Sequence, residues 1–272
     1  MAGRPLGTMI TQGYPDLDLA SELALAGRIG ATVLEILPDW GRYPDPGEAR
    51  RMASDVGMRI HSAHGCWGGR TIRASRVDLG STDPATHRAS VEDLRRCVDW
   101  LAEAGGTCLV VHPGGLSEAS EAGARREAMA FGLVELGDHA AGSSGVRICV
   151  ENMPPGVHPG SRMADLAALL RELDHPRLAL ALDTGHANLT TGVGVETRAA
   201  AGLLATTHVH DNDGRHDSHD PPGCGTIHWP AWTEALDAIG YEGPIILECI
   251  RALRRDFSGY RPEVLRGVAG RG

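Results

Sequence analysis

The feature that most constrains the fold is a series of eight short apolar runs separated by longer amphipathic stretches. Runs that are apolar on both faces are typical of strands in a parallel sheet covered by helices. The stretch at 90–106 has a helical pattern, with Asp-Pro ahead of it and two glycines at its end, which are helix start and stop signals. We therefore expect strands at 6–10, 32–37, 58–61, 108–112, 147–151, 178–183, 206–210 and 244–248, with helices between them.

Eight such units in about 250 residues match a (β/α)8 TIM barrel of the α/β class. An open doubly wound sheet is the rival fold. It usually has fewer strands, and no GxGxxG turn follows the first run. No linker, low-complexity tract or charge block divides the chain, so the sequence predicts a single TIM-barrel domain over residues 1–272.

Residues that can bind a metal ion close six consecutive runs. A single histidine at such a position is usually a packing residue, whereas a buried glutamate is costly unless it is paired or metal-bound. Six in succession are harder to explain by packing, because the carboxyl ends of barrel strands converge on one mouth. The sequence therefore predicts a metal site built from His61, His112, Glu151, Asp183, His210 and Glu248.

The stretch HVHDNDGRHDSHD at 208–220 holds four histidines and four aspartates in thirteen positions. Asp, Asn and Gly favour turns over helix interiors, so we expect a loop over the mouth, with Asp217 and His219 folding back toward its centre. Oxygen and nitrogen donors without an obvious thiolate suit Mn, Zn, Co, Mg or Fe(II). We expect one to three divalent ions, with Mn, Zn or Co as the cofactor.

Composition narrows the class of partner. The net charge of -9 and the pI of about 5.8 argue against a generic polyanion binder, so we expect no nucleic-acid partner. All 26 basic residues are arginines, and without lysine no Schiff base is available for sugar chemistry. The sequence shows no CxxC pattern, signal peptide or long apolar run, so we expect a cytoplasmic protein without membrane contact. The oligomeric state stays open.

Several motifs together identify a family resemblance. They are VVHPGG (110–115), VENMP (150–154), LDTGHANL (182–189), HVHDNDGRHDSHDPPGCGTIHW (208–229) and IILE (245–248). With these motifs the chain resembles the xylose-isomerase-like TIM barrels, and the stretch at 77–105 extends the resemblance over nearly the whole chain. That superfamily contains sugar and sugar-phosphate isomerases and epimerases, and also the endonuclease IV group of phosphodiesterases.

The resemblance implies two ligand sets. In epimerase-like members a single metal ion would be held by Glu151, Asp183, His210 and Glu248. In endonuclease IV-like members three zinc ions use a larger set. Its matches here are His61, His112, Glu151, Asp183, His186, His210, Asp217, His219 and Glu248.

Under the epimerase interpretation, the expected reaction is metal-assisted proton transfer next to the carbonyl of a small carbohydrate-like substrate. Glu151 and Glu248 end strands on opposite sides of the mouth, so one would remove the proton and the other return it. His186 would hydrogen-bond a substrate oxygen or orient a ligand, or would only cap the segment after 178–183.

Two other functions stay open. A phosphoester hydrolase of the endonuclease IV type would use two or three ions, and action on DNA would also need a basic track. Arg70, Arg73 and Arg76 offer only a small one. The third possibility is a barrel that binds a metal or a sugar without catalysis, and the complete ligand set counts against it.

Two residues depart from the family's usual loop. Cys224 stands where Glu is usual, and His228 stands where Asp is common before Trp. We expect Cys224 to be a spectator rather than a nucleophile. Further candidates for the lining of the mouth, by position, are Glu35, Asp39, Trp40, Trp67 and Trp229.

Overall fold

A computed structural model describes residues 3–10, 18–37, 45–65, 77–143, 145–249 and 261–270 of the chain. The strands are β1 (Leu6–Ile10), β2 (Val33–Ile36), β3 (Arg59–His64), β4 (Cys108–Val111), β5 (Arg147–Glu151), β6 (Leu178–Asp183), β7 (Leu204–Val209) and β8 (Ile245–Leu247). The helices are α1 (Leu19–Arg28), α2 (Pro46–Asp55), α3 (Pro84–Ala104), η2 (Ala119–Glu121), α4 (Ala122–Ser143), α5 (Met163–Leu173), α6 (Thr184–Asn188), α7 (Val193–Ala199), α8 (Trp229–Ala238) and α10 (Pro262–Val268).

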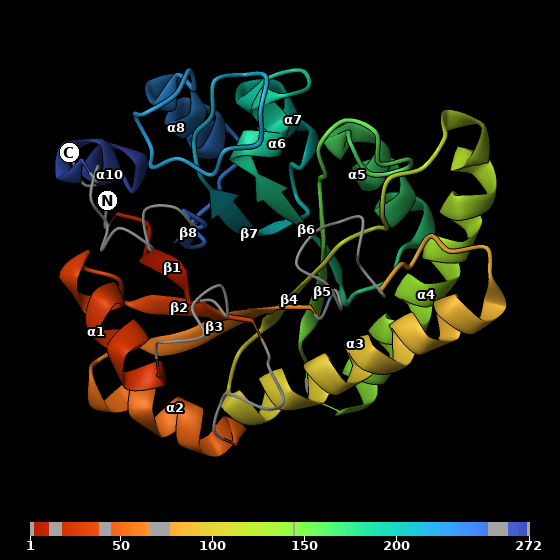
Figure 1. Ribbon diagram of the computed structural model, residues 1–272, viewed down its shortest axis with the longest axis horizontal. Helices are drawn as coiled ribbons and strands as arrows, with labels where there is room; N and C mark the ends of the chain where they lie inside the picture. Colours follow the sequence, from red (N-terminus) through yellow and green to blue (C-terminus); the bar gives the residue numbers. More distant parts are fainter. Residues whose placement is uncertain are drawn as a thin grey trace.

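All eight strands are parallel, and each is hydrogen-bonded to the next. β8 also pairs with β1, so the sheet closes into a barrel with no free edge. The helices lie around the outside, with α3 and α4 side by side on one flank (Figure 1). The predicted TIM barrel is confirmed, and closure excludes the open doubly wound sheet. That the domain covers all 272 residues stays a prediction.

Helix α3, which precedes β4, shows how local sequence signals fix the two ends of a helix. The Asp83 side chain accepts a hydrogen bond from Thr86 N at 2.8 Å, and Pro84 occupies the first turn. Gly105 ends α3 in the left-handed region at φ 82°. The helix therefore begins at Pro84 rather than at the predicted residue 90. Its buried face includes Val91, Leu94, Cys97, Val98 and Leu101.

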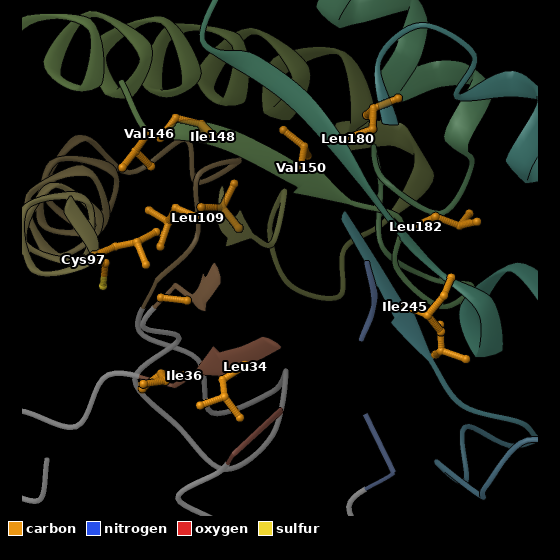
Figure 2. Close-up of a cluster of buried hydrophobic side chains, with 14 of the residues drawn as sticks. Leu34, Ile36, Cys97, Leu109, Val146, Ile148, Val150, Leu180, Leu182 and Ile245 are labelled. Atoms are coloured by element: carbon orange, nitrogen blue, oxygen red, sulfur yellow. The ribbon is translucent and has the colours of Figure 1, made fainter. Parts of the chain in front are cut away.

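The two faces of the strands carry different side chains. On the outer face Leu109 and Val150 belong to the main core under the helices, and Figure 2 shows Leu109 beside Cys97 of α3. The inner face below the mouth is filled by a separate cluster of small residues, namely Cys108, Val110, Cys149, Ala179, Ala181 and Ala205. Side chains alternate along a strand, so the inner face continues from Cys149 to Glu151 at the mouth.

The two ends of the described chain meet beside the barrel. Arg4 N donates to Ala269 O at 2.8 Å. In the part of the chain that the structure describes, no helix is both long enough and apolar enough to cross a bilayer.

Candidate metal centre

Four buried side chains form a compact group at the mouth of the barrel, which we call the central group: Glu151, Asp183, His208 and Glu248. One donor atom from each lies within 4.8 Å of the others. Nδ1 of His208 is 2.9 Å from Oε1 of Glu151 and 3.0 Å from Oε2 of Glu248. Two carboxylates thus converge on one imidazole nitrogen.

The strand geometry explains why these four meet. Glu151 and Asp183 are the last residues of β5 and β6, and Glu248 directly follows β8. In β7 the outer-face residue Val209 packs in the main core, so its neighbour His208 points inward. Four adjacent strands therefore deliver their donors to one point.

The electrostatics of the central group demand positive charge. Burial alone would lower the pKa of His208, but Glu35, Glu151 and Glu248 outweigh it and raise that pKa well above its usual value. Burial would raise the pKa of Glu151, but His208 and His112 hold it well below its usual value. Buried carboxylates in this state need a protonated imidazole or a metal ion between them.

A second group, the flanking group, joins His64 and His112 to Glu151. Nε2 of His112 is 3.3 Å and Nε2 of His64 is 3.6 Å from Oε2 of Glu151. Among the described residues, this buried Oε2 has no well-formed hydrogen bond. Glu151 therefore offers one oxygen to the central group and the other to the flanking group.

A third group, the outer group, contains His186, His210, Asp217 and His219. Oδ2 of Asp217 lies 3.3 Å from Nε2 of both His186 and His219. Burial would lower the pKa of His186, but Asp183 and Asp217 raise it to about 10. Nε2 of His210 is 3.0 Å from Oδ1 of Asp183, which links the outer group to the central group.

Neighbouring backbone and side chains fix these donors in place. The Asn152 side chain accepts from Asp183 N at 2.8 Å and donates to Asp183 O at 3.1 Å. Thr184 Oγ1 donates to His210 O at 2.7 Å. A Cβ on Gly185 would lie 1.8 Å from Cε1 of His210, so only glycine leaves room for that ring.

The loop after β7 folds back over the mouth, as the sequence predicts. Asp211 anchors it by accepting from Ile227 N and from Nε1 of Trp229, each at 3.1 Å. His219 adopts a left-handed backbone at φ 49°, a conformation that is uncommon outside glycine and concentrates at functional sites. There its Nδ1 donates to Glu248 O at 2.9 Å.

The three groups fit divalent ions. The central group offers three carboxylates and one imidazole, which suits Mn, Zn or Co. Oε2 of Glu151, which has no well-formed hydrogen bond among the described residues, is a buried oxygen that a cation would satisfy. The identity and number of ions stay predictions.

Eight of the nine predicted ligands lie in these groups: His112, Glu151, Asp183, His186, His210, Asp217, His219 and Glu248. His61 does not, and the prediction that its strand ends there is wrong, because β3 continues to His64. At about 3.3 Å per residue His61 lies roughly 10 Å below His64. It sits by Cys108, whose thiol pKa is lowered by Cys149 and also by His61.

The sequence interpretation misses two members of the groups, His64 and His208. The structure places His208, not His210, in the central group, and His210 in the outer group. The sequence does contain a signal for His208. With Val209 facing outward, both histidines of HVH must face inward, whereas the prediction takes only the last residue of each run as a ligand.

The remaining candidate residues from the sequence have different surroundings, and some lie outside the described residues. Glu35 is fully buried behind His208, whereas Cys224 is exposed. His228 caps α8 by accepting a backbone hydrogen bond, and Trp229 packs against Trp232 in the core rather than forming a wall. Outside the described residues lie Asp39, Trp40, Trp67, Arg70, Arg73 and Arg76.

Comparison with known proteins agrees with the barrel fold. A family model described as xylose isomerase-like TIM barrel matches residues 23–264. An uncharacterised protein of Methanocaldococcus jannaschii is 29% identical over 64% of this chain and 61% of its own length. A ketose 3-epimerase of Arthrobacter globiformis is 31% identical over 63% of this chain and 59% of its own length. The chain thus spans about three fifths of these relatives.

A crystal structure of a D-tagatose 3-epimerase-like protein superposes with a TM-score of 0.79. It covers 98% of this chain and 99% of that one at 22% identity. At that identity the likeness concerns the fold.

Proposed function

Because the chain belongs to the xylose isomerase-like TIM barrel family, we propose that it is a divalent-metal-dependent sugar isomerase or epimerase. The observation that carries the proposal is the buried central group at the mouth of the barrel. The similarity to a ketose 3-epimerase supports a carbohydrate substrate and a reaction at a carbon next to its carbonyl.

Glu151 and Glu248 have the proposed proton-transfer roles. A divalent ion bound between the donors would polarise the substrate carbonyl and acidify the neighbouring C–H. Burial would raise the pKa of Glu248, but His208 and His219 lower it to about 2, and the pKa of Glu151 is also depressed. The lowered pKa values favour the ionised form of both carboxylates, so either one can accept a proton from the substrate. The opposite carboxylate would first have to take up a proton from solvent, which it would then donate to the other face of the substrate.

His186 has a supporting role in this proposal. Its Nδ1 donates to Asn152 O at 2.8 Å, which leaves Nε2 directed toward Asp217 at 3.3 Å. Because Nδ1 already donates to the backbone, Nε2 of the neutral ring can accept a hydrogen bond from a substrate hydroxyl, and Nε2 of the protonated ring can donate one.

Solvent exchange tests the reaction. The purified protein is incubated in D2O with a panel of free and phosphorylated ketoses, with and without chelator. We expect deuterium at a carbon next to the carbonyl and a new epimer or isomer, both lost when the metal is removed. Failure to exchange any ketose, in protein that holds its metal, would contradict the proposal.

A second candidate function is phosphoester hydrolysis by a multinuclear zinc site. The observation that favours it is the flanking and outer groups on either side of the central group. Ions in all three groups would stabilise the attacking and leaving oxygens of a phosphoester. Two or three Zn per chain with release of p-nitrophenol from a phosphodiester would support it, and one Mn or Co with C–H exchange would support the epimerase. Absence of both activities would favour the third possibility, a barrel that binds a metal or a sugar without catalysis.

A further inference from the structure

One buried carboxylate lies outside the central group yet touches it. Glu35 of β2 has no exposed surface, and its Oε1 lies 2.6 Å from Nε2 of His208. Its other oxygen, Oε2, accepts a hydrogen bond from Ser62 Oγ at 2.6 Å. Both oxygens are therefore engaged, one by the imidazole and one by the hydroxyl.

The contact constrains the His208 ring from the side opposite the central group. Nε2 faces Glu35, while Nδ1 faces Glu151 and Glu248. The ring cannot turn about its axis without breaking contacts on both sides. When Nε2–H donates to Glu35, the neutral imidazole keeps its Nδ1 lone pair directed at the central group.

A backbone irregularity sets this contact up. Leu34 pairs with Ile60, but the register shifts at Glu35, which pairs with Ser62 and not with His61. Such a bulge redirects side chains at a barrel rim. The shift places the Ser62 hydroxyl beside Glu35.

From this geometry we infer that Glu35 is a positioning residue, which fixes the tautomer and orientation of His208 so that Nδ1 is available to a metal ion. The inference rests on the metal centre of the proposed function. Glu35 acts through His208, and Ser62 holds Glu35 in turn.

Metal affinity tests the inference independently of turnover. Zn²⁺ binding by wild type, Glu35→Leu, Glu35→Gln and Ser62→Ala is measured by competition with a chromogenic chelator. Loss of such a hydrogen-bond partner typically costs about 10–100-fold in affinity, which we expect for Glu35→Leu. Glu35→Gln should lose less, because its amide oxygen still accepts from Nε2–H. Ser62→Ala should lose least.

Nitrogen-15 NMR of the His208 ring provides the second readout. In zinc-loaded wild type, Nε2 should carry the proton and Nδ1 should not, whereas Glu35→Leu should show mixed tautomers. The matched control is Glu196→Gln, since Glu196 is also buried but binds Met163 N at 2.7 Å and Arg162 on the outer layer. That variant should lose thermal stability and keep wild-type zinc affinity.

Folded Glu35 variants with wild-type affinity and an unchanged His208 tautomer would overturn the inference and leave the proposed function intact. A wild-type protein that binds no divalent ion would overturn both. If Glu35→Leu does not fold, Glu35→Gln and Ser62→Ala still decide the question.

Discussion

Nδ1 of His208 lies 2.9 Å from Oε1 of Glu151, a contact that joins β7 to β5 across the intervening strand. The other oxygen of Glu151 faces His112 and His64. Glu151 is thus shared by two of the three groups, and the first variants to make follow from that position.

Glu151→Gln should lower turnover by at least about 10²- to 10⁴-fold, the range expected for loss of a proton-transfer group. The amide neither accepts the proton nor supplies an anion to the central group. Steady-state kcat on the identified substrate measures the effect. Glu172→Gln is the matched control, because Glu172 is exposed and pairs with Arg126 far from the mouth. Wild-type turnover in Glu151→Gln would contradict the assignment of Glu151 as a proton-transfer residue.

His208→Asn and His210→Asn should lose different ions. His208 belongs to the central group and His210 to the outer group, so the first should lose the ion that supports proton transfer. The second should keep that ion and lose outer-group occupancy. Metal per chain by mass spectrometry, paired with C–H exchange, separates the two. Greater loss of exchange in His210→Asn would reverse our assignment.

Metal removal should lower thermal stability. The donors converge only in the folded barrel, so an ion binds the native state in preference to the unfolded chain. At a free ion concentration 100 times Kd, this linkage contributes about 2.7 kcal/mol. Calorimetry with and without chelator measures the shift in Tm. The smaller shift expected in Glu151→Gln is the internal comparison, and an equal shift would point to binding elsewhere.

Gly185→Ala should displace His210, because the new Cβ would overlap its ring. Forcing extra atoms into a packed site costs about 1–3 kcal/mol. We expect reduced stability to denaturant and loss of the outer-group ion, with the central ion retained. Gly142→Ala in α4 is the matched control, since a Cβ at that position would have no neighbouring atom within 4 Å. A wild-type ion content in Gly185→Ala would contradict this prediction, because it would show that the segment around His210 moves to accommodate the new Cβ.

Leu101→Ala should destabilise the barrel by about 2–5 kcal/mol, as expected when a fully buried leucine leaves a cavity. Leu101 lies on the inner face of α3, away from the donors. Urea denaturation measures the loss, and the metal content of the folded protein should not change. A change in metal content would indicate that the packing of α3 affects metal binding at the mouth.

The sequence is sufficient to predict the barrel and the donors that end uniformly apolar runs. Glu151 and Asp183 follow unbroken apolar residues, so alternation and position agree. The end of β3 is predicted too early because Ser62 interrupts its apolar pattern, although the strand continues to His64. The Ser62 hydroxyl donates a hydrogen bond to Glu35, and no local sequence pattern predicts this contact.

His208 escapes prediction for a related reason. Near the mouth of a barrel, the inward-facing residues of a strand become polar before the strand ends. The end of an apolar run therefore does not show which inward-facing residues are metal ligands. His208 occupies that zone, and its partner Glu35 is 173 positions away in the chain. Hydrogen bonds of that range depend on how the sheet closes, and a single sequence does not specify their pairing.

The donors of the three groups come from β3 to β8 and the segments that follow them. Within the described residues, β1 contributes none, and its Thr8 instead bonds Leu247 O. The ring of donors is therefore an incomplete arc. Among the described residues, a molecule seated in this mouth would meet fixed ionic contacts from the β3-to-β8 side and none from β1 or β2, so the uneven ring would favour one orientation of that molecule.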